Sequence, residues 1–431
     1  MSAASAEPRE RAWFGQPRGL TILFLTNMWE TFSYYGMRAL LVFYMTKQLG
    51  MAQGQASLVY GTYIACAYLT PIAGGVIADR VLGKRRAIII GASIMAVGHF
   101  LMTWEALLYV ALAIIALGNG LFLPTLPSQI DDLYEPGDPR VGWAYNVYYV
   151  GVNIGGFLAP LVCGTLGEIY GWHYGFAAAG IGMCAGLAIY LWGQRYLPAA
   201  ARHPKVERGA APPARFPRAT LMVLAAVALS VAVFRGAYEQ VGNTVAVWAD
   251  GAVDRAAFGQ TIPITWFFSL NPLLVMLMTP LLLALWRRRA AEGGTERPAR
   301  RMALGALVVA ASYLMLAALA ARGGATAWPW FAAFFLVYTL GEILILPTGL
   351  GLFARLAPAG LGATTVAAWY LTIFAGSFAA GLVGTLFSHM TPAAFFSLLA
   401  GIATVAAAML RLADPLEQRA EQRMTQGRNI D

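Results

Sequence analysis

The chain is divided into long apolar segments that recur from near residue 19 to residue 413. A helix of about twenty apolar residues crosses the ~30 Å hydrocarbon core of a bilayer. In lipid, only helices and closed barrels satisfy every backbone polar group. The sequence therefore predicts an all-α integral membrane protein with twelve transmembrane helices, near residues 19–47, 55–77, 87–104, 106–127, 142–165, 173–196, 219–247, 262–286, 302–321, 327–354, 362–386 and 391–413.

The composition supports burial in lipid. The chain has 431 residues, of which 59% are hydrophobic and 12% are charged, whereas a soluble domain has about twice that charged fraction. The net charge of +9 does not indicate nucleic-acid binding, because the basic residues lie in short loops between apolar segments. We find neither a nucleotide-binding loop nor a His/Cys spacing typical of metal sites, so no cofactor or metal is expected.

The three cysteines lie in predicted spans and form no CxxC pair. We expect Cys66, Cys163 and Cys184 to be buried and to act as small hydrophobic residues, not as a disulfide framework.

The distribution of Lys and Arg predicts the orientation in the membrane. Residues 1–18 are polar and lack the features of a cleavable signal. If both termini are cytoplasmic, almost every basic residue outside the spans faces the cytoplasm, and the exceptions are Lys47, Arg255 and Arg322. This bias predicts cytoplasmic termini and a plasma (inner) membrane location.

The longest connection without an apolar segment, residues 198–218, is basic and rich in Pro and Ala. Such a composition is typical of a linker. We therefore expect a cytoplasmic segment at 1–18, a six-helix bundle at 19–197, the linker at 198–218, a second six-helix bundle at 219–413 and a charged, solvated cytoplasmic tail at 414–431.

The first span carries an unusual polar stripe. Asn27, Glu30, Thr31, Tyr34 and Arg38 follow helical spacing and so share one helix face. Ionisable groups are costly inside a bilayer and usually face a cavity. The stripe indicates a helix that lines a water-accessible cavity, and the alternative is packing against polar patches of neighbouring helices.

Three later spans also carry polar groups. Arg235 and Glu239 are four residues apart, so they are neighbours on one helix face, and opposite charges in lipid are expected to pair. The alternative is that this pair is purely structural. Asn271 and Glu342 are further polar candidates for a cavity.

Several segments resemble the proton-dependent oligopeptide transporters of the major facilitator superfamily. They are FGQPRGL at residues 14–20, FSYYGMR at 32–38, GNGLFLPT at 118–125, LYEPGDPR at 133–140, YYVGVNIG at 148–155 and GWHYGF at 171–176. The resemblance implies two six-helix halves that transport peptides by alternating access, driven by protons. It also implies a set of substrate-binding residues, namely Tyr34, Tyr35, Arg38, Tyr68, Asn153, Glu239, Asn271, Glu342 and Trp369.

The family pattern is incomplete here. Its first helix carries Glu-x-x-Glu-Arg, of which this chain keeps Glu30 but has Asn27 and Thr31 at the other two charges. Leu123 stands where the family has a helix-four Lys. We expect Arg235 to replace this Lys in part, as a fixed counter-charge, because Arg does not shed its proton. The candidates for proton coupling are therefore Glu30, Glu239 and Glu342, with Arg235 as their partner.

The loop at residues 74–86 is similar to the signature loop of the superfamily. We expect a gating role for it, carried by Gly75, Asp79, Arg80, Gly83 and Arg85. The alternative is a simple positive-inside anchor.

The predicted function is import of di- and tripeptides or peptide-like molecules by proton symport with altered coupling. The expected partners are the substrate, protons and the bilayer, without nucleic acid, and the chain is expected to be a monomer. The alternative is a divergent carrier of a non-peptide metabolite, such as a modified peptide, a siderophore-like compound or an antibiotic, which is uncoupled or coupled through another carboxylate. A membrane enzyme is disfavoured because no intramembrane nucleophile with a base is visible. The tails are expected to be too short for the soluble domain of a sensor.

Overall fold

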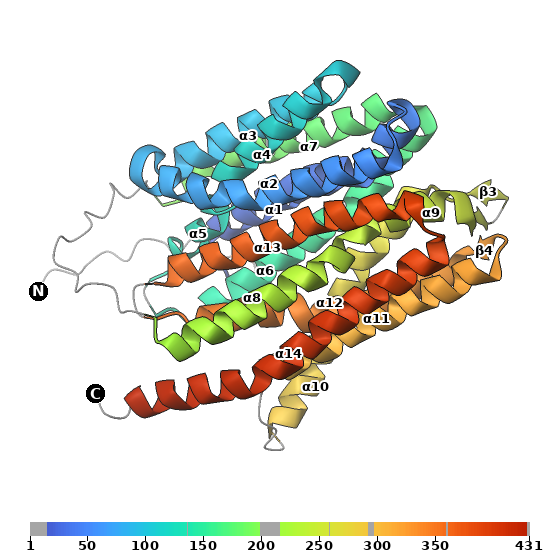
Figure 1. The fold of residues 1–431 in the computed structure, drawn as a ribbon. Helices are drawn as coiled ribbons and strands as arrows, with labels where there is room; N and C mark the ends of the chain where they lie inside the picture. The colour runs from blue at the N-terminus through green and yellow to red at the C-terminus, as the bar shows by residue number, and fades with distance from the viewer. Residues whose placement is uncertain are drawn as a thin grey trace, which may run out of the picture. The chain divides into compact units, whose positions relative to one another are not determined.

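A computed structural model describes residues 15–135, 137–198, 216–257, 259–291, 297–358 and 361–428. Phe14, most of the predicted linker and the last residues of the predicted tail lie outside the described residues. The structure confirms the all-α fold, and Figure 1 shows its long helices along the chain.

Before the predicted linker, the described residues form seven α-helices, and several of these helices are extended by short π-helical or 3-10 turns. Their bounds are α1 (Arg18–Phe43), α2 (Gln53–Ile77), α3 (Lys84–Leu101), α4 (Leu108–Phe122), α5 (Thr125–Asp131), α6 (Val141–Ala159) and α7 (Trp172–Gly193).

The second set of described helices follows the same pattern. Their bounds are α8 (Arg218–Tyr238), α9 (Thr244–Ala252), α10 (Leu270–Ala291), α11 (Pro298–Arg322), α12 (Trp328–Arg355), α13 (Gly362–Thr385) and α14 (Pro392–Arg428). Four two-residue strands lie in the connections: β1 (Val253–Asp254) pairs in parallel with β4 (Thr326–Ala327), and β2 (Ala256–Ala257) pairs antiparallel with β3 (Gln260–Thr261).

Ten helical stretches of the described residues are long and apolar enough to cross a membrane. They comprise α2, α4 with α5, α6, α7, α8 with α9, and each of α10 to α14. The two remaining stretches are α1, which carries the polar stripe, and α3, which begins with three basic residues. A long helical stretch therefore lies on each of the twelve predicted ranges.

The chain forms two compact units. The first contains Met1–Met37 and Thr70–Val206, and the second contains Arg38–Leu69 and Glu207–Asp431. The end of α1, the start of α2 and the connection between them, residues 38–69, thus join the second unit, although the sequence predicts them in the first bundle.

The second unit is closely packed around α8. This helix packs against α13 and α14, and α11 packs against α12 and α14 (Figure 1). The start of α2 approaches α13 at Gly61 and Gly381, where a Cβ atom on Gly61 would overlap the backbone of Gly381. Small residues allow such close contact between membrane helices.

The prediction of a solvated tail after residue 413 is wrong for its first turns, which continue α14. Asp414 is 4% exposed and Glu417 is 1% exposed. Arg300 Nε lies 2.7 Å from Asp414 Oδ2, and the backbone N–H of Ala299 donates to Glu417 Oε2 at 3.0 Å. Glu417 thus satisfies a backbone N–H in the first turn of α11, and both carboxylates lie near this helix start, whose positive end favours negative charge.

The prediction of three buried thiols is right only for Cys163. Cys66 is partly buried and Cys184 is exposed on α7. An exposed residue in a membrane-spanning helix can face lipid, so a small apolar thiol is still accommodated there.

Candidate functional site

The predicted span at 219–247 is interrupted in the middle of its polar part. Helix α8 ends at Tyr238, a 3-10 turn covers Glu239–Gly242, and α9 begins at Thr244. Asn243 between them has φ −121° and ψ −100°, which is not helical. The interruption places Glu239 at the end of a helix, where backbone carbonyls lose their helical partners.

Side chains replace those partners on three consecutive carbonyls. Tyr313 Oη donates to the Ala237 carbonyl at 2.6 Å, and Tyr338 Oη donates to the Tyr238 carbonyl at 2.7 Å. Gln240 Nε2 donates to the Gly236 carbonyl at 3.0 Å and to the Ala380 carbonyl at 2.8 Å. The break is therefore built into the unit and positions Glu239 firmly.

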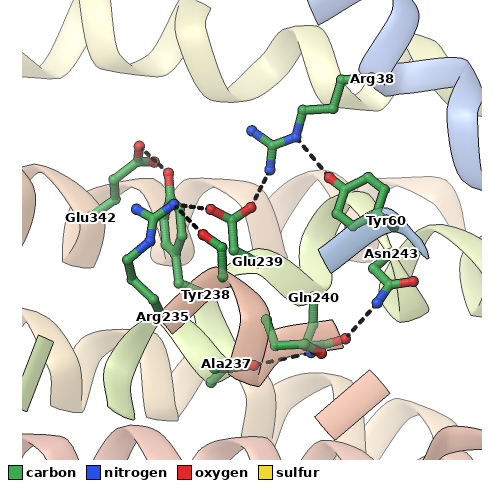
Figure 2. Close-up of polar contacts among 12 residues, drawn as sticks. Arg38, Tyr60, Arg235, Ala237, Tyr238, Glu239, Gln240, Asn243 and Glu342 are labelled. Atoms are coloured by element: carbon green, nitrogen blue, oxygen red, sulfur yellow. Dashed lines mark hydrogen bonds and ion pairs between the residues drawn. The ribbon is translucent and has the colours of Figure 1, made fainter. Parts of the chain in front are cut away.

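Glu239 lies between two guanidinium groups (Figure 2). Arg38 Nη2 lies 2.5 Å from Glu239 Oε2, and Arg235 Nη2 pairs with Glu239 Oε1. Glu239 is 1% exposed and Arg235 is 3% exposed. The structure thus confirms the predicted pairing of Arg235 with Glu239, and it adds Arg38 to the cluster.

Arg38 is the accessible member of this cluster. Its side chain is 17% exposed, and its Nε donates to Tyr60 Oη at 2.7 Å. Gly242 makes room for this contact, since a Cβ atom there would overlap the Tyr60 hydroxyl. The Arg38 side chain is therefore partly exposed while two of its nitrogens are held.

Arg235 is enclosed on several sides. Its Nη2 donates to Ser377 Oγ at 3.2 Å, and its guanidinium carbon lies 5.5 Å from the Tyr68 ring centroid and 5.3 Å from that of Tyr238. A cation over an aromatic face is stabilised by the ring quadrupole. The structure therefore places the predicted residue Tyr68 against Arg235.

Glu342 has a different environment from Glu239. Tyr238 Oη donates to its Oε1 at 2.7 Å (Figure 2), and Asn271 Nδ2 donates to its Oε2. Asn271 Nδ2 also lies 3.1 Å from Thr339 Oγ1. Among the ion pairs of the described residues, none involves Glu342, so the donors seen on its carboxyl group are neutral.

A polar chain extends from this cluster toward the start of α2. Gln240 Oε1 accepts from Asn243 Nδ2 at 3.3 Å, Asn243 Oδ1 accepts from Ser57 Oγ at 2.8 Å, and Gln53 Nε2 donates to the Gly384 carbonyl at 3.0 Å. Sequence reasoning missed Tyr60, Asn243 and Ser377. Asn243 could have been identified as a candidate from the sequence, because a polar amide inside an apolar segment is uncommon.

Among the ion pairs of the described residues, none involves Glu30, the predicted carboxylate of α1 in the first unit. Glu30 is 7% exposed and accepts from Thr31 Oγ1 at 3.3 Å. The rings of Tyr34 and Tyr35 meet edge to face at 5.4 Å, and Asn153 Nδ2 donates to the carbonyl of Tyr149 on its own helix at 2.9 Å.

Trp369 is placed in the core of the second unit. It is 4% exposed, and its ring lies 5.1 Å from that of Phe353 of α12. This position favours a packing role for most of its surface.

The family model PTR2, described as the POT family, matches residues 85–209 and 217–399. This chain belongs to the POT family. A di-/tripeptide transporter of Lactococcus lactis subsp. cremoris is 30% identical over 90% of this chain and 93% of its own length. The uncharacterized transporter YclF of Bacillus subtilis (strain 168) is 29% identical over 95% of this chain and 96% of its own.

Solved structures agree with this assignment. A crystal structure of a peptide transporter POT in complex with sulfate matches this POT protein with a TM-score of 0.88 and 28% identity, over 95% of this chain and 97% of that one. The chain therefore has the major facilitator fold of a multi-pass membrane transporter, and its family consists of transporters, not enzymes. The described residues contain no group of three metal-ligating side chains.

The loop after α2 has a defined local structure in this POT protein. It runs through a π-helical turn at Ala78–Leu82 and turns at Gly83 into α3. Arg85 Nη2 donates to the carbonyls of Leu197 at 2.7 Å and Pro198 at 2.5 Å, and Lys84 Nζ lies 2.7 Å from Asp132 Oδ2. Basic residues of the loop thus bind the ends of neighbouring segments in the first unit.

Proposed function

We propose that this POT protein imports di- and tripeptides or peptide-like molecules across the inner membrane by proton symport. The main support is a pair of side chains in the second unit that could bind the two ends of a peptide. They are the partly exposed Arg38 and Glu342, whose carboxyl group accepts from neutral donors. The two ends of a free peptide at neutral pH carry one carboxylate and one ammonium group. These groups are complementary in charge to Arg38 and Glu342.

Each of these two side chains is complementary to one end of the substrate. The planar fork of Arg38 can bind a carboxylate through two hydrogen bonds. Glu342 would bind the ammonium group, with Asn271 beside it. Tyr34, Tyr35, Tyr68, Asn153, Glu239 and Trp369 complete the proposed substrate-binding set.

We assign proton coupling to carboxyl groups, because a buried Arg keeps its charge. Glu30, Glu239 and Glu342 are the candidates, and Arg235 is the fixed partner of Glu239. One charge moving through ~150 mV gives about 3.5 kcal/mol. This free energy supports roughly hundredfold accumulation of substrate.

We infer that coupling differs from that of other family members. Asn27, Thr31 and Leu123 stand at positions where the family pattern has charged residues. Thr31 donates a side-chain hydrogen bond to Glu30, and a hydroxyl group cannot hold a carboxylate as an Arg would.

A second candidate substrate class rests on Arg235. This permanent cation is buried beside the binding residues, and Leu123 removes the family's helix-four cation. A rearranged set of charges suits a carrier of another metabolite, such as a modified peptide, a siderophore-like compound or an antibiotic, with altered coupling.

We place both termini in the cytoplasm, on the distribution of Lys and Arg. The loop with Gly75, Asp79, Arg80, Gly83 and Arg85 would then lie on the cytoplasmic side and take part in gating. We propose that the transporter works as a monomer.

Uptake into proteoliposomes tests the function. A panel of labelled di- and tripeptides is supplied with and without an inward proton gradient, to wild type and to Arg38→Ala. Gradient-driven accumulation that Arg38→Ala abolishes supports a peptide symporter. Peptide exchange without accumulation means that coupling is lost, and absence of any peptide flux means that the substrate is not a peptide.

A further inference from the structure

Glu239 forms ion pairs with two arginines, which come from different helices and differ in exposure. Arg235 lies four residues before it, in the last turn of α8, and pairs with Oε1. Arg38 comes from α1 and pairs with Oε2 at 2.5 Å. Only Arg38 is partly accessible, with 17% of its side chain exposed against 4% for Arg235.

This difference matters when a substrate carboxylate binds Arg38. With Arg38 as its sole partner, Glu239 would be left as an unpaired buried carboxylate, which is strongly unfavourable. Uptake of a proton by Glu239 would remove that charge. Here Arg235 remains in contact with Glu239, so the carboxylate keeps a cation after Arg38 leaves.

We propose that Arg235 is a retained counter-ion, which lets Arg38 leave Glu239 for a substrate carboxylate without protonation of Glu239. This inference rests on the proposed function, since it concerns how a peptide carboxylate reaches Arg38. Arg235 acts through Glu239 and is therefore a positioning residue. Substrate binding at Arg38 is then independent of a proton on Glu239.

The surroundings keep Arg235 in place during this exchange. Ser377 accepts a hydrogen bond from it at 3.2 Å, and the rings of Tyr68 and Tyr238 lie within 5.5 Å and 5.3 Å of its guanidinium carbon. None of these contacts involves Arg38. The retained pair of Arg235 and Glu239 can therefore persist when Arg38 moves.

The groups that act on Glu239 come from several helices. The charged and titratable ones are Arg38 of α1, Tyr60 of α2, Arg235 of α8, Tyr313 of α11, and Tyr338 and Glu342 of α12. Helix α13 contributes Ser377, which accepts from Arg235 and does not titrate. Tyrosines stay neutral over the range of transport assays, so Glu342 is the other group whose charge can change.

The test is counterflow of labelled dialanine in proteoliposomes, with equal pH on both sides, stepped from about pH 5.5 to about pH 8. The half-saturating concentration is compared between wild type and Arg235→Gln. In the variant, binding of the peptide requires a proton on Glu239, so its half-saturating concentration rises with pH relative to wild type. The rise approaches tenfold per pH unit, as expected when one proton binds together with the peptide.

A second substitution separates this role from a structural one. The double variant Arg235→Gln with Glu239→Gln has no carboxylate at position 239 that could be left unpaired. The ratio of its half-saturating concentration to that of wild type therefore becomes independent of pH. Arg235→Lys keeps a cation beside Glu239 as long as the Lys is protonated, and over that pH range its half-saturating concentration follows that of wild type. Arg411→Gln removes an exposed Arg of α14 and serves as the control for loss of charge elsewhere. Glu342 and Glu30 are present in every variant, so pH effects that the variants share with wild type cancel in the ratio of half-saturating concentrations.

The outcomes are distinct. Suppose that wild type shows counterflow and that the half-saturating concentration of Arg235→Gln changes with pH in the same way as that of wild type. This result overturns the inference and leaves the proposed function intact. The inference is also overturned if the half-saturating concentration of Arg235→Gln rises with pH and the double variant shows the same rise. Absence of wild-type counterflow overturns the proposed function and this inference together. If Arg235→Gln does not fold, Arg235→Met replaces it, because Met retains an aliphatic chain between the two rings, and the same outcomes apply.

Discussion

Arg38 and Glu239, which are 201 residues apart in the chain, form an ion pair of 2.5 Å. The pair connects the C-terminal end of α1 to the break between α8 and α9, and both residues belong to the second unit. Since Arg38 also donates to Tyr60 at 2.7 Å, its guanidinium is oriented before any substrate arrives. Orientation of a binding group in advance lowers the entropy cost of binding.

The first prediction concerns the shape of this guanidinium. Arg38→Lys keeps the charge but loses the fork that contacts Tyr60 and Glu239 together. We expect the KM for dialanine to rise about tenfold to a hundredfold, since a charge-assisted hydrogen bond contributes about 1.5–3 kcal/mol. Uptake by proteoliposomes measures this change. A KM equal to that of wild type would show that charge alone is sufficient at this position.

The second prediction concerns the space beside Tyr60. A Cβ atom at Gly242 would overlap the Tyr60 hydroxyl, so Gly242→Ala is expected to displace Tyr60 from Arg38 and to reduce uptake several-fold. Overpacking of a tight site costs about 1–3 kcal/mol.

Removal of the hydroxyl supplies the control for Gly242. In Gly242→Ala combined with Tyr60→Phe, the overlapping atom is absent, and uptake should recover to the level of Tyr60→Phe alone. A double variant that is worse than both single variants would contradict a simple steric origin.

The sequence predicted the twelve helical ranges because a bilayer imposes a minimum length on each apolar segment. It also predicted the pairing of Arg235 with Glu239, since residues four apart share a helix face. The contact of Arg38 with Glu239 could not be found in this way, because it joins distant segments. The break at Asn243 was missed for a related reason: the hydroxyls of Tyr313 and Tyr338 that stabilise it come from α11 and α12.

The third prediction concerns Glu342 and the amino end of the substrate. Glu342→Gln removes the negative charge while keeping a similar shape and the ability to contact Tyr238 and Asn271. We expect the KM for dialanine to rise at least about tenfold, in the range of a lost charge-assisted interaction. N-acetyl-dialanine has no ammonium group and is the matched control substrate. If Glu342→Gln weakens both substrates equally, Glu342 does not recognise the amino end.

The last prediction concerns stability and is independent of substrate. Glu417 Oε2 accepts from the Ala299 N–H at the start of α11, and Glu417 is 1% exposed. Glu417→Ala leaves this N–H without its partner, which is comparable to the loss of an N-cap and costs about 0.5–2 kcal/mol. We expect a Tm in detergent that is lower by a few degrees, whereas the KM for dialanine is unchanged, because Glu417 lies outside the proposed site. Glu135→Gln, which alters an exposed carboxylate of the first unit, should leave the Tm unaltered. An equal Tm for Glu417→Ala and wild type would mean that water satisfies the Ala299 N–H as well as the carboxylate does. The end of α14 would then not stabilise α11 through this contact.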